Sequence, residues 1–264
     1  FAQPPGAMLV VREDADALRA RLPQGVEIVG CNAPTQTVLG GTDAAIEAFA
    51  ATLAAEDVAC TRLRVSHAFH SHLMEGALPL FRRAFDGVAL HPPERIFYSC
   101  VSGLPVTVEQ ATSIDYWCRQ LRAPVRFADA VRHVLEQGPA LLLEAGPSQA
   151  LSGLVRGMLD GRGRVVASLG PASRAGDAQE QVLRALGECW CAGLAPDWPA
   201  LHGEVPRRRV SLPGYPFHGK RYWVEPAATA PAAIDMTPAA ATTSAASPSP
   251  EETASMPSAA PSPS

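Results

Sequence analysis

The stretch Thr37-Val38-Leu39-Gly40-Gly41-Thr42-Asp43-Ala44-Ala45-Ile46 decides the fold of the first part of the chain. It passes from an apolar strand to a helix, because the Thr42 hydroxyl can cap a helix N-terminus and the apolar residues after it recur at helical spacing. Around it we expect strands at 7–12, 26–31 and 60–65, a helix at 14–22 and a turn at Asn32-Ala33-Pro34. The order strand, helix, strand, strand, helix, strand predicts a ferredoxin-like sandwich over residues 6–65.

A second α/β section is predicted over residues 66–193. Its centre is Ala140-Leu141-Leu142-Leu143-Glu144-Ala145-Gly146-Pro147, a short apolar run that is typical of a buried parallel strand feeding a helix. The other elements expected are helices at 78–85, 116–121, 127–135, 148–159 and 178–191, and strands at 96–101 and 165–169. This alternation predicts a three-layer arrangement, in which ligands usually bind beyond the carboxyl ends of the strands.

Composition separates the end of the chain from the folded part. Residues 194–225 are rich in aromatic residues and arginine, and we expect them to wrap over a folded surface and anchor by their aromatic rings. Residues 226–264 are almost entirely Ala, Pro, Ser and Thr, so they cannot bury enough apolar surface to offset the entropy of ordering. We expect them to be a disordered interdomain linker.

Charge and hydropathy exclude several classes of function. The formal net charge of −4 argues against nucleic-acid binding, which needs a clustered positive field. No apolar run is long enough to span a bilayer, and the first residues do not have the pattern of a signal peptide. The sequence therefore predicts a cytoplasmic protein that binds neither nucleic acid nor a membrane.

The cysteines do not suggest a metal or redox site. The spacing of Cys189-Trp190-Cys191 fits neither a zinc ribbon nor a Cys-x-x-Cys motif. We expect all six to be buried free thiols: Cys31, Cys60, Cys100, Cys118, Cys189 and Cys191.

Three histidines lie among apolar residues in one segment, Val65-Ser66-His67-Ala68-Phe69-His70-Ser71-His72-Leu73-Met74. An imidazole titrates near neutrality, so it can take a proton from a nucleophile and return it to a leaving group. The residues alone leave three roles open: structural histidine, metal ligand and catalytic base. No nearby carboxylate-plus-cysteine set supports a metal, and no Gly-x-Ser-x-Gly turn supplies a nucleophile, since Ser152 is expected inside a helix. On this basis a structural role is favoured.

Several motifs together resemble the acyltransferase domain of modular (type I) polyketide synthases. They are Asn32-Ala33-Pro34, the histidine segment, Tyr116-Trp117-Cys118-Arg119-Gln120-Leu121-Arg122-Ala123-Pro124-Val125-Arg126-Phe127 and Leu142-Leu143-Glu144-Ala145-Gly146-Pro147. A further motif resembles the linker that follows that domain; it is Leu212-Pro213-Gly214-Tyr215-Pro216-Phe217-His218-Gly219-Lys220-Arg221-Tyr222-Trp223. The resemblance implies a ferredoxin-like small subdomain at 6–65, the carboxy-terminal part of an α/β-hydrolase-like large subdomain at 66–193 and a post-acyltransferase linker at 194–225.

The resemblance also implies roles for individual residues. In that family an acyl group passes from an acyl-CoA to a serine and then to the phosphopantetheine thiol of an acyl carrier protein, with a histidine as base. The matching histidine is His70, and the main-chain carbonyl that orients it matches Gln120. His67 and Phe69 fall where the family reads the substituent of the extender unit, and His-Ala-Phe-His resembles malonyl-selective members. We therefore expect malonyl-CoA as substrate, with no cofactor bound by the chain itself and no metal.

Three features of the family are missing: its Gly-His-Ser-x-Gly nucleophile turn, the glutamine that helps to form the oxyanion hole and the arginine that pairs with the malonyl carboxylate. All three belong to a part that precedes the small subdomain, and the chain begins near the point where that subdomain opens. The first hypothesis is a fragment of an acyltransferase, inactive alone, working with acyl carrier protein and ketosynthase domains of the same synthase. The alternatives are a non-catalytic scaffold or docking segment and, less favoured, a hydrolase of related shape.

Overall fold

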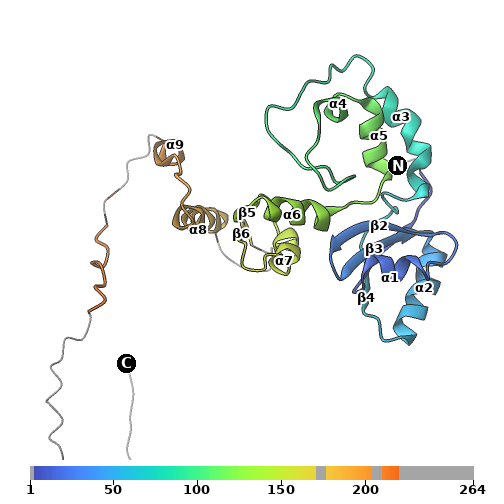
Figure 1. The fold of residues 1–264 in the computed structure, drawn as a ribbon, viewed down its shortest axis with the longest axis horizontal. Coiled ribbons are helices and arrows are strands. Elements are labelled where there is room, and N and C mark those ends of the chain that lie inside the picture. Colours follow the sequence, from blue (N-terminus) through green and yellow to red (C-terminus); the bar gives the residue numbers. More distant parts are fainter. Residues whose placement is uncertain (1–2, 171–176, 204–207, 209, 220–264) are drawn as a thin grey trace, which may run out of the picture. The chain divides into compact units, whose positions relative to one another are not determined.

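The computed structural model describes residues 3–170, 177–203, 208 and 210–219 (Figure 1). The chain divides into two compact units, Phe1–Val205 and Pro206–Ser264. In the second unit residues 210–219 form neither helix nor strand, and the Tyr215 and Phe217 rings pack edge to face with centroids 5.1 Å apart. The tail expected at 226–264 lies outside the described residues, as do residues 220–223 of the linker motif. The expected wrapping of residues 194–225 over a folded surface stays a prediction.

The first part of unit one is the expected ferredoxin-like sandwich. The strands are β1 (Ala7–Val11), β2 (Val26–Ala33), β3 (Gln36–Gly41) and β4 (Cys60–Arg62), and the helices are α1 (Ala15–Arg19) and α2 (Asp43–Ala55). The strands form one antiparallel sheet in the order β2-β3-β1-β4. Leu9 of β1 lies opposite Leu39 of β3 in this register.

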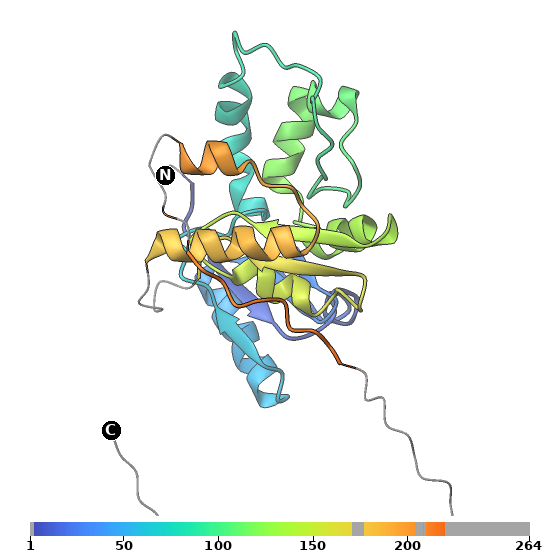
Figure 2. The same cartoon turned by 90° about the vertical axis from the view of Figure 1, so that its left-hand side faces the viewer.

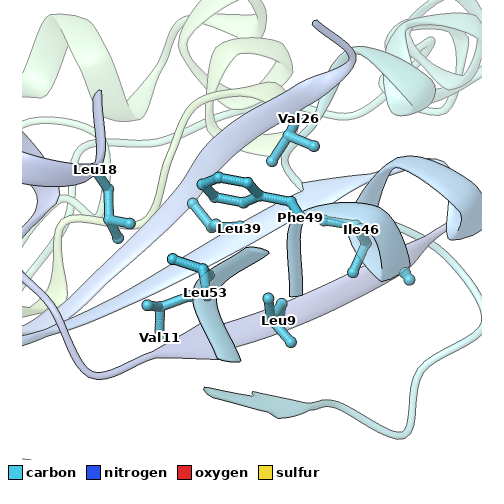
Figure 3. Packing of buried hydrophobic residues seen from close by; sticks show 9 residues of the cluster. Leu9, Val11, Leu18, Val26, Leu39, Ile46, Phe49 and Leu53 are labelled. Atoms are coloured by element: carbon cyan, nitrogen blue, oxygen red, sulfur yellow. The ribbon is translucent and has the colours of Figure 1, made fainter. Parts of the chain in front are cut away.

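One apolar core holds both helices against the same face of the sheet (Figure 3). Its members are buried residues of α1, α2 and three of the strands: Ala7, Leu9, Val11, Leu18, Val26, Leu39, Ile46, Phe49 and Leu53. The Thr42 Oγ1 accepts a hydrogen bond from the Ala45 amide at 3.3 Å, so it caps α2 as its position predicts. The opposite face of the sheet is left for the rest of the unit.

The turn between β2 and β3 is shorter than expected. Asn32 and Ala33 belong to β2, and only Pro34 and Thr35 form the turn. The strand extends further because Ala33 pairs with Gln36 across a two-residue hairpin, with a register irregularity between Cys31 and Ala33.

The middle of unit one is helical and is hydrogen-bonded to the sandwich. It contains the 3₁₀ helix η1 (His72–Ala77), α3 (Leu78–Arg83), α4 (Val108–Ala111), α5 (Ile114–Arg122) and α6 (Phe127–Glu136). Between α5 and α6, the Val125 amide donates to the Val29 carbonyl at 2.9 Å and the Cys31 amide donates to the Val125 carbonyl at 2.8 Å. This seam fixes the end of α5 beside strand β2.

The strand expected at 96–101 does not form. Only a single bridge pairs Tyr98 with Pro105, and Ile96 is 81% exposed. Ser99 organises a tight turn instead, because its Oγ accepts from the Val101 amide at 3.0 Å and from the Tyr116 hydroxyl at 2.8 Å. Such local side-chain hydrogen bonds compete with a strand ladder.

The last part of unit one has three layers. Strands β5 (Ala140–Glu144) and β6 (Gly163–Ala167) are parallel, α7 (Ala150–Arg156) connects them, and α8 (Ala178–Cys191) and α9 (Trp198–His202) follow. One face of the strand pair packs on α6 and α7, and the other packs on α8, the long yellow-orange helix of Figure 2. The run 140–144 is less buried than expected, since Leu143 is 54% exposed.

The cysteines are all free thiols, as expected, but only Cys118 and Cys189 are buried. Cys31, Cys60 and Cys100 are partly buried, and Cys191 is exposed, so the expectation of burial is wrong for Cys191. Among the described residues, no helix is long and apolar enough to cross a membrane.

Candidate functional site

His70 lies in a turn between β4 and η1 and has a left-handed backbone, with φ of +65°. Non-glycine residues rarely adopt this conformation, and where they do, the surrounding structure must hold it. In the described part of the chain only Asp57 and Asp160 share it, and both lie in turns.

Small residues hold the histidine segment on the open face of the sheet. Ala68 is fully buried, and a Cβ atom built on Gly6 or Gly40 would lie 3.0 Å or 3.5 Å from its Cβ atom. The Gly6 amide also donates to the Ser66 carbonyl at 3.2 Å, and the Ser71 Oγ donates to the Ala68 carbonyl at 2.6 Å. Gly6, directly before β1, and Gly40 of β3 therefore allow the segment to approach closely.

The pKa of His70 favours the neutral form of its imidazole. Burial lowers its pKa from the ordinary value of 6.5, and the main-chain carbonyls of Ala123 and Gln120 act in the opposite direction. Its Nδ1 is fully buried, and neither carbonyl is within strict hydrogen-bond geometry of it. The carbonyls are thus near enough to influence the ring without a well-formed hydrogen bond. A neutral imidazole can accept a proton.

The structure brings Gln120 to His70, as the sequence expectation requires, and adds Ala123 as a second neighbour. No serine or cysteine among the described residues is hydrogen-bonded to the imidazole. The adjacent Ser71 is fully buried and already donates to Ala68, and Ser152 is fully buried within α7. The described residues therefore offer a candidate base, His70, but no nucleophile within hydrogen-bond reach of it.

The other two residues of the predicted site lie together. His67 is buried and its Nδ1 lies 2.8 Å from the Ser66 Oγ. The His67 and Phe69 rings have centroids 6.2 Å apart at 44°. The structure thus pairs these rings directly before His70; their selectivity role stays a prediction.

A charged network surrounds the main chain of the site. The Arg122 Nη1 donates to the His70 carbonyl at 3.1 Å, its Nη2 lies 2.9 Å from a Glu27 oxygen, and its Nε lies 3.1 Å from a Glu75 oxygen. The other Glu27 oxygen is 2.8 Å from the His72 Nδ1. Sequence reasoning missed this network, although Glu27 gave a signal: it alternates with core residues in β2, so it faces the site side of the sheet.

The fold and the site together define a class. A ferredoxin-like sandwich beside three-layer α/β structure holds a partly buried histidine with a lowered pKa in a strained turn. A perturbed histidine of this kind is typical of enzymes that use general-base catalysis. Within the described residues, no group of three or more His, Cys, Asp and Glu side chains is arranged to hold a metal ion.

Comparison with known proteins names the family. Residues 1–196 match the model of the acyl transferase domain family. The polyketide synthase GfsB of Streptomyces halstedii is 40% identical over 230 residues, which is 85% of this chain and 4% of that synthase. The chain belongs to the acyl transferase domain family, in the form found in polyketide synthases.

Solved structures of acyltransferases are similar to this chain as well. The acyltransferase domain from the second module of the salinomycin polyketide synthase is similar with a TM-score of 0.70 and 35% identity, covering 77% of this chain and 48% of that one. A complex of a type II polyketide synthase acyl-carrier protein with its malonyl-transacylase is similar with a TM-score of 0.60 and 27% identity, covering 71% of this chain and 60% of the solved one. The chain therefore spans about half the length of the solved acyltransferase domain and a small part of the curated synthase.

Proposed function

We propose that the chain supplies the base and the extender-recognition loop of an acyl transfer site that loads a malonyl unit from malonyl-CoA onto an acyl carrier protein. The observation that carries the proposal is His70: a partly buried imidazole with a lowered pKa and a buried Nδ1, in a strained turn, at the position that matches the family's base. Family membership and the likeness to solved acyltransferase domains support it.

The serine nucleophile in this proposal comes from outside the 264 residues. The chain has no Gly-x-Ser-x-Gly turn, and it covers 48% of the salinomycin acyltransferase domain. The chain by itself then forms no acyl-enzyme.

Each transfer moves one proton through His70. In the first step the imidazole accepts the proton of the serine hydroxyl as the serine oxygen attacks the thioester carbonyl, and the carbon–sulfur bond breaks. The imidazolium then protonates the departing CoA thiolate. In the second step His70 accepts the proton of the phosphopantetheine thiol, whose sulfur attacks the serine ester, and it returns that proton to the serine oxygen. Phosphopantetheine arrives on the carrier protein, so the chain needs no cofactor of its own.

The proposed partners are an acyl carrier protein and the neighbouring ketosynthase of the same synthase. The solved complex of a malonyl-transacylase with its acyl-carrier protein supports the first of these by similarity.

The test uses the synthase segment in which this chain follows its own upstream sequence. Incubation with labelled malonyl-CoA should acylate the complete domain and transfer the label to the carrier protein, whereas His70→Asn should reduce both rates by about 10²-fold or more. Asparagine is the replacement of choice because it tolerates a left-handed backbone. Wild-type rates in His70→Asn would refute the proposal, and absence of an upstream serine turn would favour the scaffold alternative. The 264-residue chain alone should carry no label.

A further inference from the structure

The end of α5 contacts His70 at two separate places. The main-chain carbonyls of Gln120 and Ala123 act on the imidazole ring, and the Arg122 side chain donates to the His70 carbonyl at 3.1 Å. One contact bears on the side chain and the other on the main chain of the same residue. Together they constrain both the position and the orientation of the base.

Arg122 is itself held from two other elements. Its Nη2 pairs with Glu27 of β2 at 2.9 Å, and its Nε pairs with Glu75 of η1 at 3.1 Å. All three of its nitrogen atoms therefore have a partner, which suits the rigid fork of a guanidinium. Glu27 is fixed in turn by His72, at 2.8 Å.

The network is partly shielded from solvent. The side chains of Arg122 and Glu27 are 28% and 32% exposed, so their attraction is screened less than that of a pair on the open surface. By contrast, the Arg82–Asp115 pair, which also involves α5, is 54% and 73% exposed. Glu75, the third member of the network, is 59% exposed, so the shielding applies to the Arg122–Glu27 pair.

A left-handed residue needs such support. The left-handed backbone of His70 carries a conformational cost because His70 is not glycine, although histidine adopts it more often than most residues do. A charge-assisted hydrogen bond to its carbonyl favours the one peptide orientation in which that carbonyl faces Arg122. The same orientation directs the imidazole to the Gln120 and Ala123 carbonyls.

We propose that Arg122, held by Glu27 and Glu75, is a positioning residue that fixes the left-handed backbone of His70 and thereby places its imidazole for proton transfer. This inference rests on the proposed function of His70 as the base. Arg122 does not touch the reacting atoms; it acts through His70.

The experiment compares Arg122→Ala, Arg122→Lys and Glu27→Gln with the control Arg82→Ala in the complete domain, with its upstream segment present. Transfer of labelled malonyl from malonyl-CoA to the carrier protein should have a kcat about 10- to 100-fold lower in Arg122→Ala, with little change in the KM for malonyl-CoA. The reason is that misplacement of the base affects the transfer step and leaves acyl-CoA binding intact. Lysine can still donate to the His70 carbonyl, so Arg122→Lys should recover part of the loss. The kcat of Glu27→Gln should lie between those of the wild type and Arg122→Ala, and the kcat of Arg82→Ala should match that of the wild type.

The outcomes separate the two proposals. If His70→Asn is inactive while Arg122→Ala has the kcat of Arg82→Ala, the positioning role is wrong and the base assignment stands. If His70→Asn retains the wild-type rate, both fall. Should Arg122→Ala fail to fold, as judged by its thermal midpoint, Arg122→Lys and Glu27→Gln carry the test: equal changes in kcat and KM, or no change, would overturn the positioning role.

Discussion

At the scale of the residue, His70 combines a strained backbone with a partly buried imidazole whose Nδ1 is fully buried. Asp57 and Asp160 share the left-handed conformation, but they are turn residues that favour it and their side chains are not buried. Histidine shares this tolerance, so His70 differs from the two aspartates in its partial burial and in the hydrogen bond that Arg122 donates to its carbonyl.

The lowered pKa of His70 makes a prediction about pH. Burial favours the neutral form, so the base stays competent to a lower pH than an exposed histidine would, and activity falls only as the pH drops through the lowered pKa. In the complete domain, the acidic limb of the kcat/KM profile should have a midpoint below 6.5. A midpoint above that value would contradict a desolvated base.

Phe69 carries a prediction about substrate choice. Its ring lies beside that of His67, where serine would leave space for a methyl substituent. In the complete domain, Phe69→Ser should raise methylmalonyl-CoA loading relative to malonyl-CoA by about 10- to 100-fold, since one methyl group is worth about 1–3 kcal/mol in a pocket. Competition between the two labelled substrates measures the ratio. An unchanged ratio would remove Phe69 from the selectivity role, and equal loading by the wild type would remove malonyl preference itself.

At the scale of the element, the histidine segment depends on close approach by glycine. A Cβ atom at Gly6 would lie 2.8 Å from the Gly41 oxygen and 2.9 Å from the Leu73 Cδ1. We expect Gly6→Ala to lower the free energy of unfolding by about 1–3 kcal/mol through overpacking, as measured by urea denaturation.

Gly187 is the matched control for this substitution. It lies within α8, and a Cβ atom there would meet nothing within 4 Å. Gly187→Ala should therefore be neutral or stabilise by up to about 1 kcal/mol, because alanine has the higher helix propensity. Equal stability of the two variants would show that the segment does not pack against β1 as described.

Most elements could be predicted from the sequence because their apolar spacing and caps act locally. The helix at 178–191 and the capped helix after Thr42 are examples. The strand expected at 96–101 is wrong, because its apolar composition does not show that Ser99 ties the segment into a turn. Composition alone does not show whether a segment forms the hydrogen bonds of a strand or those of a local turn.

The site could be predicted only in part. The resemblance gave His70 and Gln120, which the structure brings together, since both lie in motifs that can be read along the chain. The Arg122 network could not be predicted, because Glu27, Glu75 and Arg122 meet only after β2, η1 and α5 have assembled. Interactions of this kind depend on tertiary structure.

At the scale of the whole molecule, the sandwich has a core of its own. All residues of that core lie between Ala7 and Cys60, and they pack on one face of the four-stranded sheet. We expect a polypeptide of residues 6–65 to fold alone with marginal stability, as is usual for a domain of about 60 residues. Cooperative thermal unfolding by circular dichroism would show it. A non-cooperative melt would mean that the open face needs η1 and α5.

The backbone of His70 also has a genetic consequence. Histidine codons are one nucleotide from asparagine codons, and asparagine is among the few residues that accept a left-handed backbone. A single point mutation can therefore remove the imidazole that we propose as the base while leaving the left-handed turn and the sheet beside it intact. Such a change would silence the proposed transfer without unfolding the sandwich.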